Sequence, residues 1–170
     1  MRILRVLLVV LAGVMLTACA SKFKTYNGPE VTQIQVQKGA RKMYFLHGST
    51  VLKAYDIRLG GNPIGPKQFE GDLKTPEGMY FISHKNPNSR YHLSVGISYP
   101  NENDMAFAAS QGKKPGGDIF IHGGPPKKVS GRPRTPRYAD WTAGCIAVSD
   151  KEIETIYAML RPNTPIMILP

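Results

Sequence analysis

The chain contains only two cysteines among its 170 residues, Cys19 and Cys145. A framework of disulfides, which many small exported domains use in place of a large core, is therefore excluded. No pair of histidines or cysteines has the spacing of metal ligands, so the sequence indicates neither a metal site nor a cofactor. No apolar run reaches the roughly 20 residues of an ordinary membrane-spanning helix. These absences leave a domain that folds around a hydrophobic core of its own.

The N-terminal segment nevertheless predicts export. Two arginines precede the apolar run Val6–Met15, which has the charge and length of a signal peptide. Leu16-Thr17-Ala18-Cys19 then matches the lipobox of bacterial lipoproteins, which implies cleavage before Cys19, a diacylglycerol on its sulfur and an acylated amino terminus. Ala20, in place of an aspartate, favours sorting to the periplasmic face of the outer membrane. The alternative is a plain secreted protein cut after Ala18 or Ala20.

Acidic residues are scarce, with 12 against 22 lysines and arginines, and the formal charge is +10. Removal of residues 1–18 takes away two arginines and no acids, which leaves +8 on 152 residues. A basic exported domain favours an anionic partner such as peptidoglycan, lipopolysaccharide or phospholipid head groups. The compartment argues against nucleic acid. We therefore divide the chain into a signal peptide (1–18), a lipidated tether (19–30) and one domain (31–170).

The pattern of apolar residues predicts a mainly β fold. Alternation indicates a strand around residues 31–36 and a hairpin whose strands flank 47–50. A long loop rich in glycine and proline runs from 60 to 78, and further strands are expected at 79–82, 92–98, 118–121 and 166–169. Tyr99-Pro100-Asn101, with Asp104, is predicted to shape a loop.

One helix stands out after residue 149. Ser149 and Glu152 form a capping box, and apolar residues follow at helical spacing until Pro162. The predicted fold class is therefore mainly β with one or a few short helices.

Cys145 is the candidate nucleophile, because after lipidation of Cys19 it is the only free thiol. An unpaired cysteine has little structural use in an oxidising compartment. Attack requires the thiolate, and a nearby imidazole that accepts the proton can provide it. His122 ends an apolar run and precedes Gly123 and Gly124, which allow the backbone to approach a ligand closely. Backbone N–H groups near Gly144 offer an oxyanion site. The other interpretation is that Cys145 is a small buried hydrophobe.

Three motifs carry a resemblance: Gly71-Asp72-Leu73-Lys74-Thr75-Pro76-Glu77-Gly78-Met79-Tyr80, Ile121-His122-Gly123 and Thr142-Ala143-Gly144-Cys145-Ile146. In this order they resemble the L,D-transpeptidase catalytic domain family, the cysteine enzymes of bacterial cell-wall crosslinking, from about Val31 to Leu169. The resemblance implies a β-sandwich-like domain, with Cys145 as nucleophile, His122 as base and the backbone near Gly123 orienting the imidazole. It further implies attack on the diaminoacid carbonyl at position three of a peptidoglycan stem.

The sequence departs from the family at two positions. Ala147 stands where an arginine is usual two residues after the cysteine, and Ala143 where a second histidine is common. Asp140–Ala147 resembles a divergent branch that includes a murein amidase releasing Braun-type lipoprotein. The leading hypothesis is L,D-transpeptidation, and the alternatives are hydrolysis of the same bond by an amidase or carboxypeptidase, and a non-catalytic wall-binding lipoprotein.

Other side chains are candidates for contact with the substrate. His92 is one that could share the cleft, and Trp141 and Thr142 precede the nucleophile. Basic residues between His122 and Cys145 could together bind stem-peptide carboxylates and replace the arginine absent at Ala147: Lys127, Lys128, Arg132, Arg134 and Arg137. For any one of them, a solvated basic loop is the favoured explanation.

Overall fold

The computed structural model describes residues 21–125 and 139–170. Within these ranges the elements are β1 (Gln33–Gln37), β2 (Lys42–His47), β3 (Thr50–Asp56), β4 (Gly78–Asn86), β5 (Ser94–Ile97), α2 (Glu102–Ser110), β6 (Phe120–His122), β7 (Ile146–Ala147), α3 (Asp150–Met159) and β8 (Pro165–Leu169). The strands form one eight-stranded sheet in the order β3-β2-β1-β8-β4-β5-β6-β7. The mainly β fold predicted from the sequence is confirmed.

The first half of the sheet is regular apart from one register shift, between Phe45 and Leu46 in the pairing of β2 with β3. β1, β2 and β3 are successive antiparallel neighbours, and β8 adds to β1 in parallel. Ile34 and Val36 of β1 are fully buried while their neighbours along the strand are partly exposed. This alternation of period two is what a strand with one face on the core requires.

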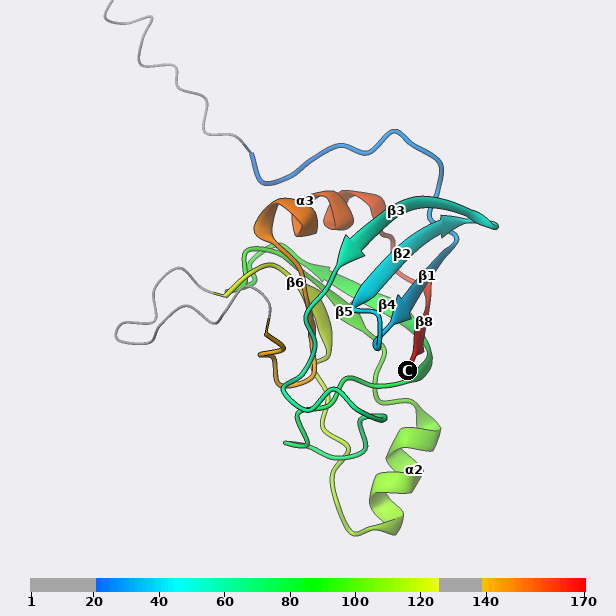
Figure 1. Ribbon diagram of the computed structural model, residues 1–170, viewed down its shortest axis with the longest axis vertical. Coiled ribbons are helices and arrows are strands. Elements are labelled where there is room, and N and C mark those ends of the chain that lie inside the picture. Colours follow the sequence, from blue (N-terminus) through cyan, green and yellow to red (C-terminus); the bar gives the residue numbers. More distant parts are fainter. Residues whose placement is uncertain (1–20, 126–138) are drawn as a thin grey trace, which may run out of the picture.

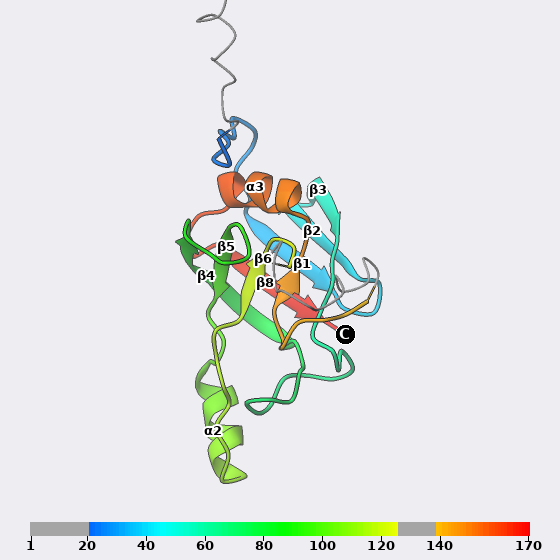
Figure 2. The same cartoon turned by 90° about the vertical axis from the view of Figure 1, so that its left-hand side faces the viewer.

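The sheet bends at β4, because this strand changes its partner along its length. Its first residues, Gly78–Phe81, pair with β8, whereas Ile82–Asn86 pair with β5. The register with β5 shifts between Ile82 and Lys85. A strand that passes from one set of neighbours to another at an irregularity turns a corner. The sandwich-like domain is accordingly one curled sheet (Figure 2).

Helix α3 closes one end of this curl, as predicted. Ser149 Oγ accepts from Glu152 N–H, and a Glu152 carboxylate oxygen accepts from Ser149 N–H at 2.8 Å, which completes the capping box. Three side chains on one face, Ile153, Ile156 and Met159, are buried. The segment that precedes β1 runs over α3, and α2 projects at the opposite end of the molecule (Figure 1).

Two local predictions were wrong, and two short elements were not predicted. Asn101 does not shape a loop but caps α2, in a capping box with Asp104. This helix escaped detection because Ala108 is its only buried residue, so it lacks an apolar stripe. The two-residue strand β7 is too short to leave a pattern. His92 lies outside β5 with a positive φ of 74°, and the strand begins at Ser94.

In the two described ranges, no helix combines the length and the apolar character needed to cross a bilayer.

Candidate active site

The pairing of β6 with β7 brings the two candidate catalytic residues together. The strands are parallel, with Ile121 opposite Ile146 and His122 opposite Ala147. Cys145 therefore precedes β7 beside Phe120, and period two places it on the same face as His122. Diagonal neighbours on adjacent strands lie about 7–8 Å apart, within reach of an imidazole. Residues 23 positions apart in sequence thus share one edge of the sheet.

The thiol of Cys145 lies in a backbone cradle. Its Sγ accepts a long hydrogen bond from Phe120 N–H at 3.4 Å and faces the carbonyl oxygen of Asp118 at 3.5 Å. Burial raises the pKa of the thiol, and the nearby Asp118 adds to the rise. The Phe120 N–H and the charge of Lys67 act in the opposite direction without reversing it. The resting residue is therefore a neutral thiol at neutral pH.

His122 is held on three sides. Its Nδ1 lies 2.7 Å from the carbonyl oxygen of Gly123, which is the contact that the resemblance implied. Because a carbonyl only accepts, Nδ1 carries the proton and Nε2 keeps its lone pair. The ring stacks on Tyr91 with centroids 4.3 Å apart, and the indole of Trp141 meets it edge-on at 5.5 Å.

Burial also determines the charge state of this imidazole. His122 is only 2% exposed, and burial lowers its pKa below the ordinary value. The hydrogen bond to Gly123 opposes this shift, and the positive charge of Arg90 reinforces it. The candidate pair is therefore a neutral thiol and a neutral base rather than a preformed thiolate and imidazolium.

Thr142 shapes the turn that presents the cysteine. Its hydroxyl donates to the carbonyl of Cys145 at 2.7 Å and accepts from Gly144 N–H at 3.1 Å. Gly144 N–H is consequently engaged. Cys145 N–H donates to none of the described residues, so it is the better candidate for holding an oxyanion.

Asp140 anchors the start of this turn. Its carboxylate accepts from Arg41 through Nε and Nη2, at 3.0 and 2.7 Å, and from Leu59 N–H at 2.8 Å. The carbonyl of Leu59 in turn accepts from the N–H groups of Trp141 and Thr142. The turn before Cys145 is thus attached to a segment some 80 residues earlier.

The loop that carries the first motif supports the same turn. Asp72 accepts from three backbone N–H groups and from Lys67 Nζ at 2.8 Å. Burial opposes ionisation, yet these hydrogen bonds outweigh it and lower the pKa of Asp72. Lys67 is buried and the Asp72 side chain is 13% exposed, so water screens this ion pair only weakly.

Gly144 has to be glycine because this loop packs directly against it. Its φ is +135°, and a Cβ there would lie 2.5 Å from the carbonyl oxygen of Lys74. Gly60 is equally constrained, since its Cβ would lie 2.0 Å from the oxygen of Leu73.

Among the other predicted site residues, Trp141 belongs to the His122 cluster and Thr142 acts within the turn. His92 does not join them: its Nε2 lies 2.9 Å from Glu154 of α3, and it lines a separate pocket. The basic residues Arg132, Arg134 and Arg137, with Lys127 and Lys128, lie outside the described residues, as do Cys19 and the predicted signal peptide.

Sequence reasoning missed Tyr91, Lys67 and the Arg41–Asp140 pair. Only Tyr91 had a signal, as an aromatic residue beside the candidate His92. Arg41 and Asp140 are 99 positions apart, and Lys67 pairs with Asp72 within a long loop that has no periodic pattern.

Ala147 forms a two-way backbone bridge with Arg58, N to O at 2.8 Å in each direction. An arginine therefore lies opposite the position at which the family usually carries one.

No group of three or more metal-ligating side chains occurs within residues 21–125 and 139–170.

The chain has relatives among known proteins in both sequence and fold. Residues 32–168 match the YkuD family model, described as the L,D-transpeptidase catalytic domain. YafK of Escherichia coli (strain K12), whose name assigns it provisionally to the L,D-transpeptidases, is 28% identical over 160 residues. The match covers 88% of this chain and 57% of YafK, so the chain spans little more than half of that relative.

Solved structures show the same fold. Pgp2 of Campylobacter jejuni, titled a helical cell shape determining protein, superposes with a TM-score of 0.60 at 28% identity, over 84% of this chain and 49% of Pgp2. An L,D-transpeptidase from Mycobacterium smegmatis gives a TM-score of 0.53 at 18% identity, over 82% of this chain and 59% of that protein.

Proposed function

The chain belongs to the L,D-transpeptidase catalytic domain family, and from this premise we propose that it remodels peptidoglycan through a thioester on Cys145. The observation that carries the proposal is the parallel β6–β7 register, which puts Cys145 and His122 on one face of adjacent strands. The substrate is the peptide stem of peptidoglycan. Sulfur attacks the carbonyl carbon of its diaminoacid, and the amide bond from that carbonyl to the next residue breaks.

The charge states define how the proton moves. With Nδ1–H bound to Gly123 O, Nε2 of His122 accepts the thiol proton as sulfur attacks the carbonyl carbon. The resulting oxyanion is held by Cys145 N–H. Collapse breaks the C–N bond, and the imidazolium returns the proton to the leaving amine. An amine or water then attacks the thioester, His122 takes its proton, and sulfur leaves and is reprotonated.

Hydrolysis is the second candidate, favoured by the absence of a side-chain cation at Ala147. A transferase has to hold a second peptide, and an arginine in this turn would help to position it. Without it, water competes better for the thioester. This outcome includes a carboxypeptidase and an amidase that detaches a wall-linked lipoprotein.

The decisive experiment is incubation of the protein with disaccharide tetrapeptides and with wall fragments carrying a covalently attached lipoprotein, with products read by mass. New crosslinks between diaminoacids support transfer, whereas a shortened stem or released lipoprotein supports hydrolysis. Binding to sacculi without turnover of either substrate would overturn the enzyme proposal in favour of a wall-binding lipoprotein.

We further propose that Cys19 is lipidated and anchors the domain to the periplasmic face of the outer membrane. The lipobox and Ala20 support this assignment. Cys19→Ser should remain unprocessed and lose its lipid, as read by radiolabelled palmitate and membrane fractionation. Normal processing and fractionation of this variant would contradict the anchor.

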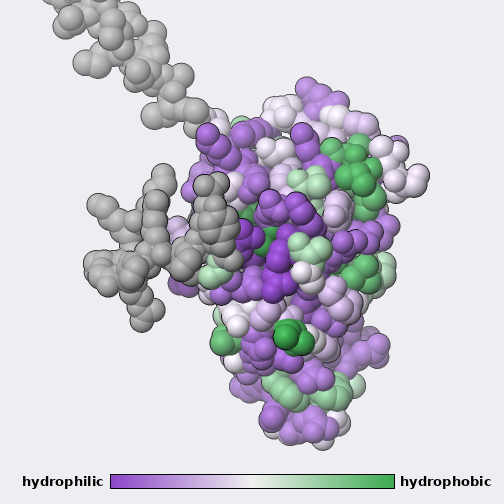
Figure 3. All heavy atoms as spheres, viewed as in Figure 1, coloured by the Kyte–Doolittle hydropathy of each residue, from purple (hydrophilic) through white to green (hydrophobic). Residues whose placement is uncertain are grey.

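The surface suits a polar polymer as substrate. The face seen in Figure 3 is largely hydrophilic, with apolar side chains in separate groups. A sugar–peptide strand with charged groups needs no large apolar platform.

A further inference from the structure

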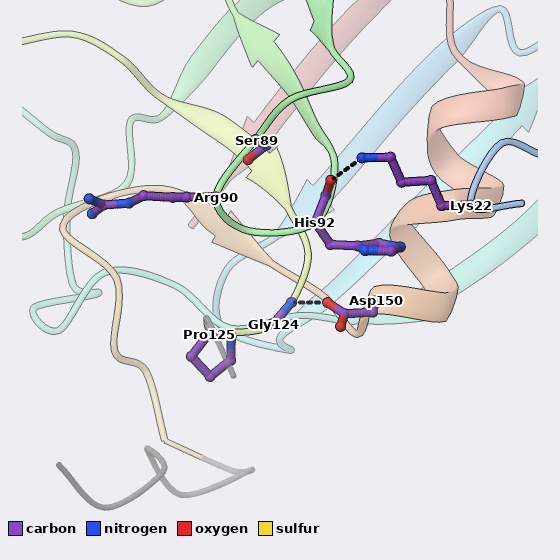
Figure 4. Close-up of a pocket in the computed structure, with 7 residues that line it drawn as sticks. All are labelled: Lys22, Ser89, Arg90, His92, Gly124, Pro125 and Asp150. Carbon is purple, nitrogen blue, oxygen red and sulfur yellow. Dashed lines mark hydrogen bonds between the residues drawn. The ribbon is translucent and has the colours of Figure 1, made fainter. Parts of the chain in front are cut away.

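A pocket begins where β6 ends, beside the candidate active site. It has a volume of about 320 Å³ and is lined by Lys22, Ser89, Arg90, His92, Gly124, Pro125 and Asp150 (Figure 4). Gly124 is the second residue after His122, so one wall of the pocket continues the strand that carries the base. The mechanism above gives none of the lining side chains a role.

The charges of this pocket are unbalanced. Lys22 Nζ donates to the carbonyls of Pro87 and His92, at 2.6 and 3.2 Å, and Arg90 Nη2 donates to the hydroxyl of Tyr91 at 2.9 Å. Neither cation forms an ion pair with a described carboxylate. Asp150 is the one acid in the lining, and its Oδ1 accepts from Gly124 N–H at 3.0 Å.

The remaining titratable lining residue does not alter this balance. His92 faces Glu154, whose second oxygen also binds Lys24 at 3.0 Å. Two cations thus face one acid, which favours an anionic ligand.

The N-terminal segment is fixed in place at this pocket. Lys24 pairs with Glu154, and the ring of Phe23 contacts that of Tyr157 on α3 at 6.1 Å between centroids. These contacts hold Lys22 against the loop before β5. The residue therefore belongs to the wall of the pocket and not to a free tether.

Arg90 links the pocket to the active site. Its guanidinium lies 5.0 Å from the centroid of the Tyr91 ring, and Tyr91 stacks on His122. In Figure 4 Arg90 and Lys22 lie on opposite sides of the pocket, and the Arg90 side chain extends outward, away from the other lining residues. Only the ring of Tyr91 would then separate a ligand bound at Arg90 from His122, the proposed base.

We propose that this pocket is a subsite for carboxylate groups of the substrate peptide, with Arg90 and Lys22 as its cationic ends. This proposal rests on the proposed function only because it takes the ligand to be an acidic peptide stem. The subsite fixes the stem so that its scissile carbonyl meets Cys145. It also makes the N-terminal segment a part of substrate recognition.

The test measures binding in a Cys145→Ala background, where no turnover occurs. Titration calorimetry compares a disaccharide tetrapeptide with the same peptide whose carboxylates are amidated. Arg90→Gln and Lys22→Gln should each weaken binding of the free acid about tenfold, as expected for loss of one charged hydrogen bond. The amidated peptide should bind all these proteins equally weakly. Arg90→Lys, which keeps the charge, should weaken binding of the free acid less than Arg90→Gln does.

The matched control is Lys53→Gln, which removes the same charge from the exposed strand β3 and should leave binding unchanged. Equal losses for both peptides would mean that Arg90 only supports Tyr91, and unchanged binding of the free acid would overturn the subsite. Failure of the wild type to turn over stems, with charge-dependent binding intact, would overturn the proposed function and leave the subsite standing.

Discussion

The two halves of the sheet are built in different ways. The strands β3, β2, β1 and β8 have five to seven residues each and are held by backbone ladders whose register shifts only once, between Phe45 and Leu46 of β2. The strands β6 and β7 have three and two residues, and the turn before β7 depends on side chains from elsewhere in the chain. Regular pairing supplies the framework, whereas Thr142, Asp140 and Asp72 supply the geometry of the site. Substitutions should therefore act on chemistry in one half and leave it untouched in the other.

The largest effect is expected at the nucleophile. Cys145→Ala should reduce turnover of tetrapeptide stems to background, because no other described thiol can form the thioester. The melting temperature should stay within a few degrees of the wild type, since the side chain is small and only partly buried. Lys53→Gln in β3 should retain full turnover. Residual activity of the Cys145→Ala protein would remove the thioester from the mechanism.

Loss of the base comes next. His122→Ala should lower kcat by about 10²–10⁴-fold, the usual contribution of general base catalysis. Because burial lowers the pKa of His122, wild-type turnover should stay high on acidification until the pH falls below about 6.5, the ordinary histidine value. Below it, the protonated imidazole can no longer accept the thiol proton.

The pH dependence of the alkylation rate of Cys145 tests the charge state of its thiol. Burial raises the pKa of the thiol, so labelling by iodoacetamide should still be rising above pH 8.5, the ordinary cysteine value. A plateau already reached at pH 6–7 would instead indicate a preformed thiolate–imidazolium pair.

The ion pair of Lys67 and Asp72 should have the largest effect on stability. Asp72→Asn leaves Lys67 as a buried cation without its carboxylate, which costs about 3 kcal/mol in free energy of unfolding. Chemical denaturation measures the loss. Because the folded pKa of Asp72 is lowered, its contribution is present above about pH 4, the unfolded value, and is lost as the pH falls through the folded one. Equal loss of stability at pH 3 and pH 7 would contradict this assignment.

A smaller change is expected from the turn. Thr142→Val removes one donated and one accepted hydrogen bond and should cost about 1–2 kcal/mol. It should also slow labelling of Cys145, because the turn no longer fixes the thiol beside Phe120. Thr142→Ser keeps the hydroxyl and should restore the labelling rate, which separates the hydrogen bonds from packing.

The smallest effect is expected in the regular half. Lys42 and Asp56 form an exposed ion pair between β2 and β3. Asp56→Asn should leave both the melting temperature and turnover unchanged, since water screens such a pair and the backbone ladder holds the strands. A loss comparable with that of Asp72→Asn would erase the distinction between the two halves.

Elements whose pattern is local could be predicted from the amino-acid sequence alone. The alternation of apolar residues predicted the strands of the regular half, and the Ser149 capping box predicted α3. Three motifs in a fixed order indicated the family. Cys145 and His122 became candidates from their residue types and from the scarcity of thiols. Such features depend on neighbours within a few positions, so a linear reading can find them.

How those residues are held depends on contacts that form only in the folded chain. The curl at β4, the neutral state of the candidate pair, the Arg41–Asp140 anchor and the pocket between Lys22 and Arg90 all depend on residues far apart in the chain. Burial sets the charge states, and burial follows from packing. Helix α2 was not predicted because it packs little against the core. Its sequence therefore lacks a stripe of apolar residues at helical spacing.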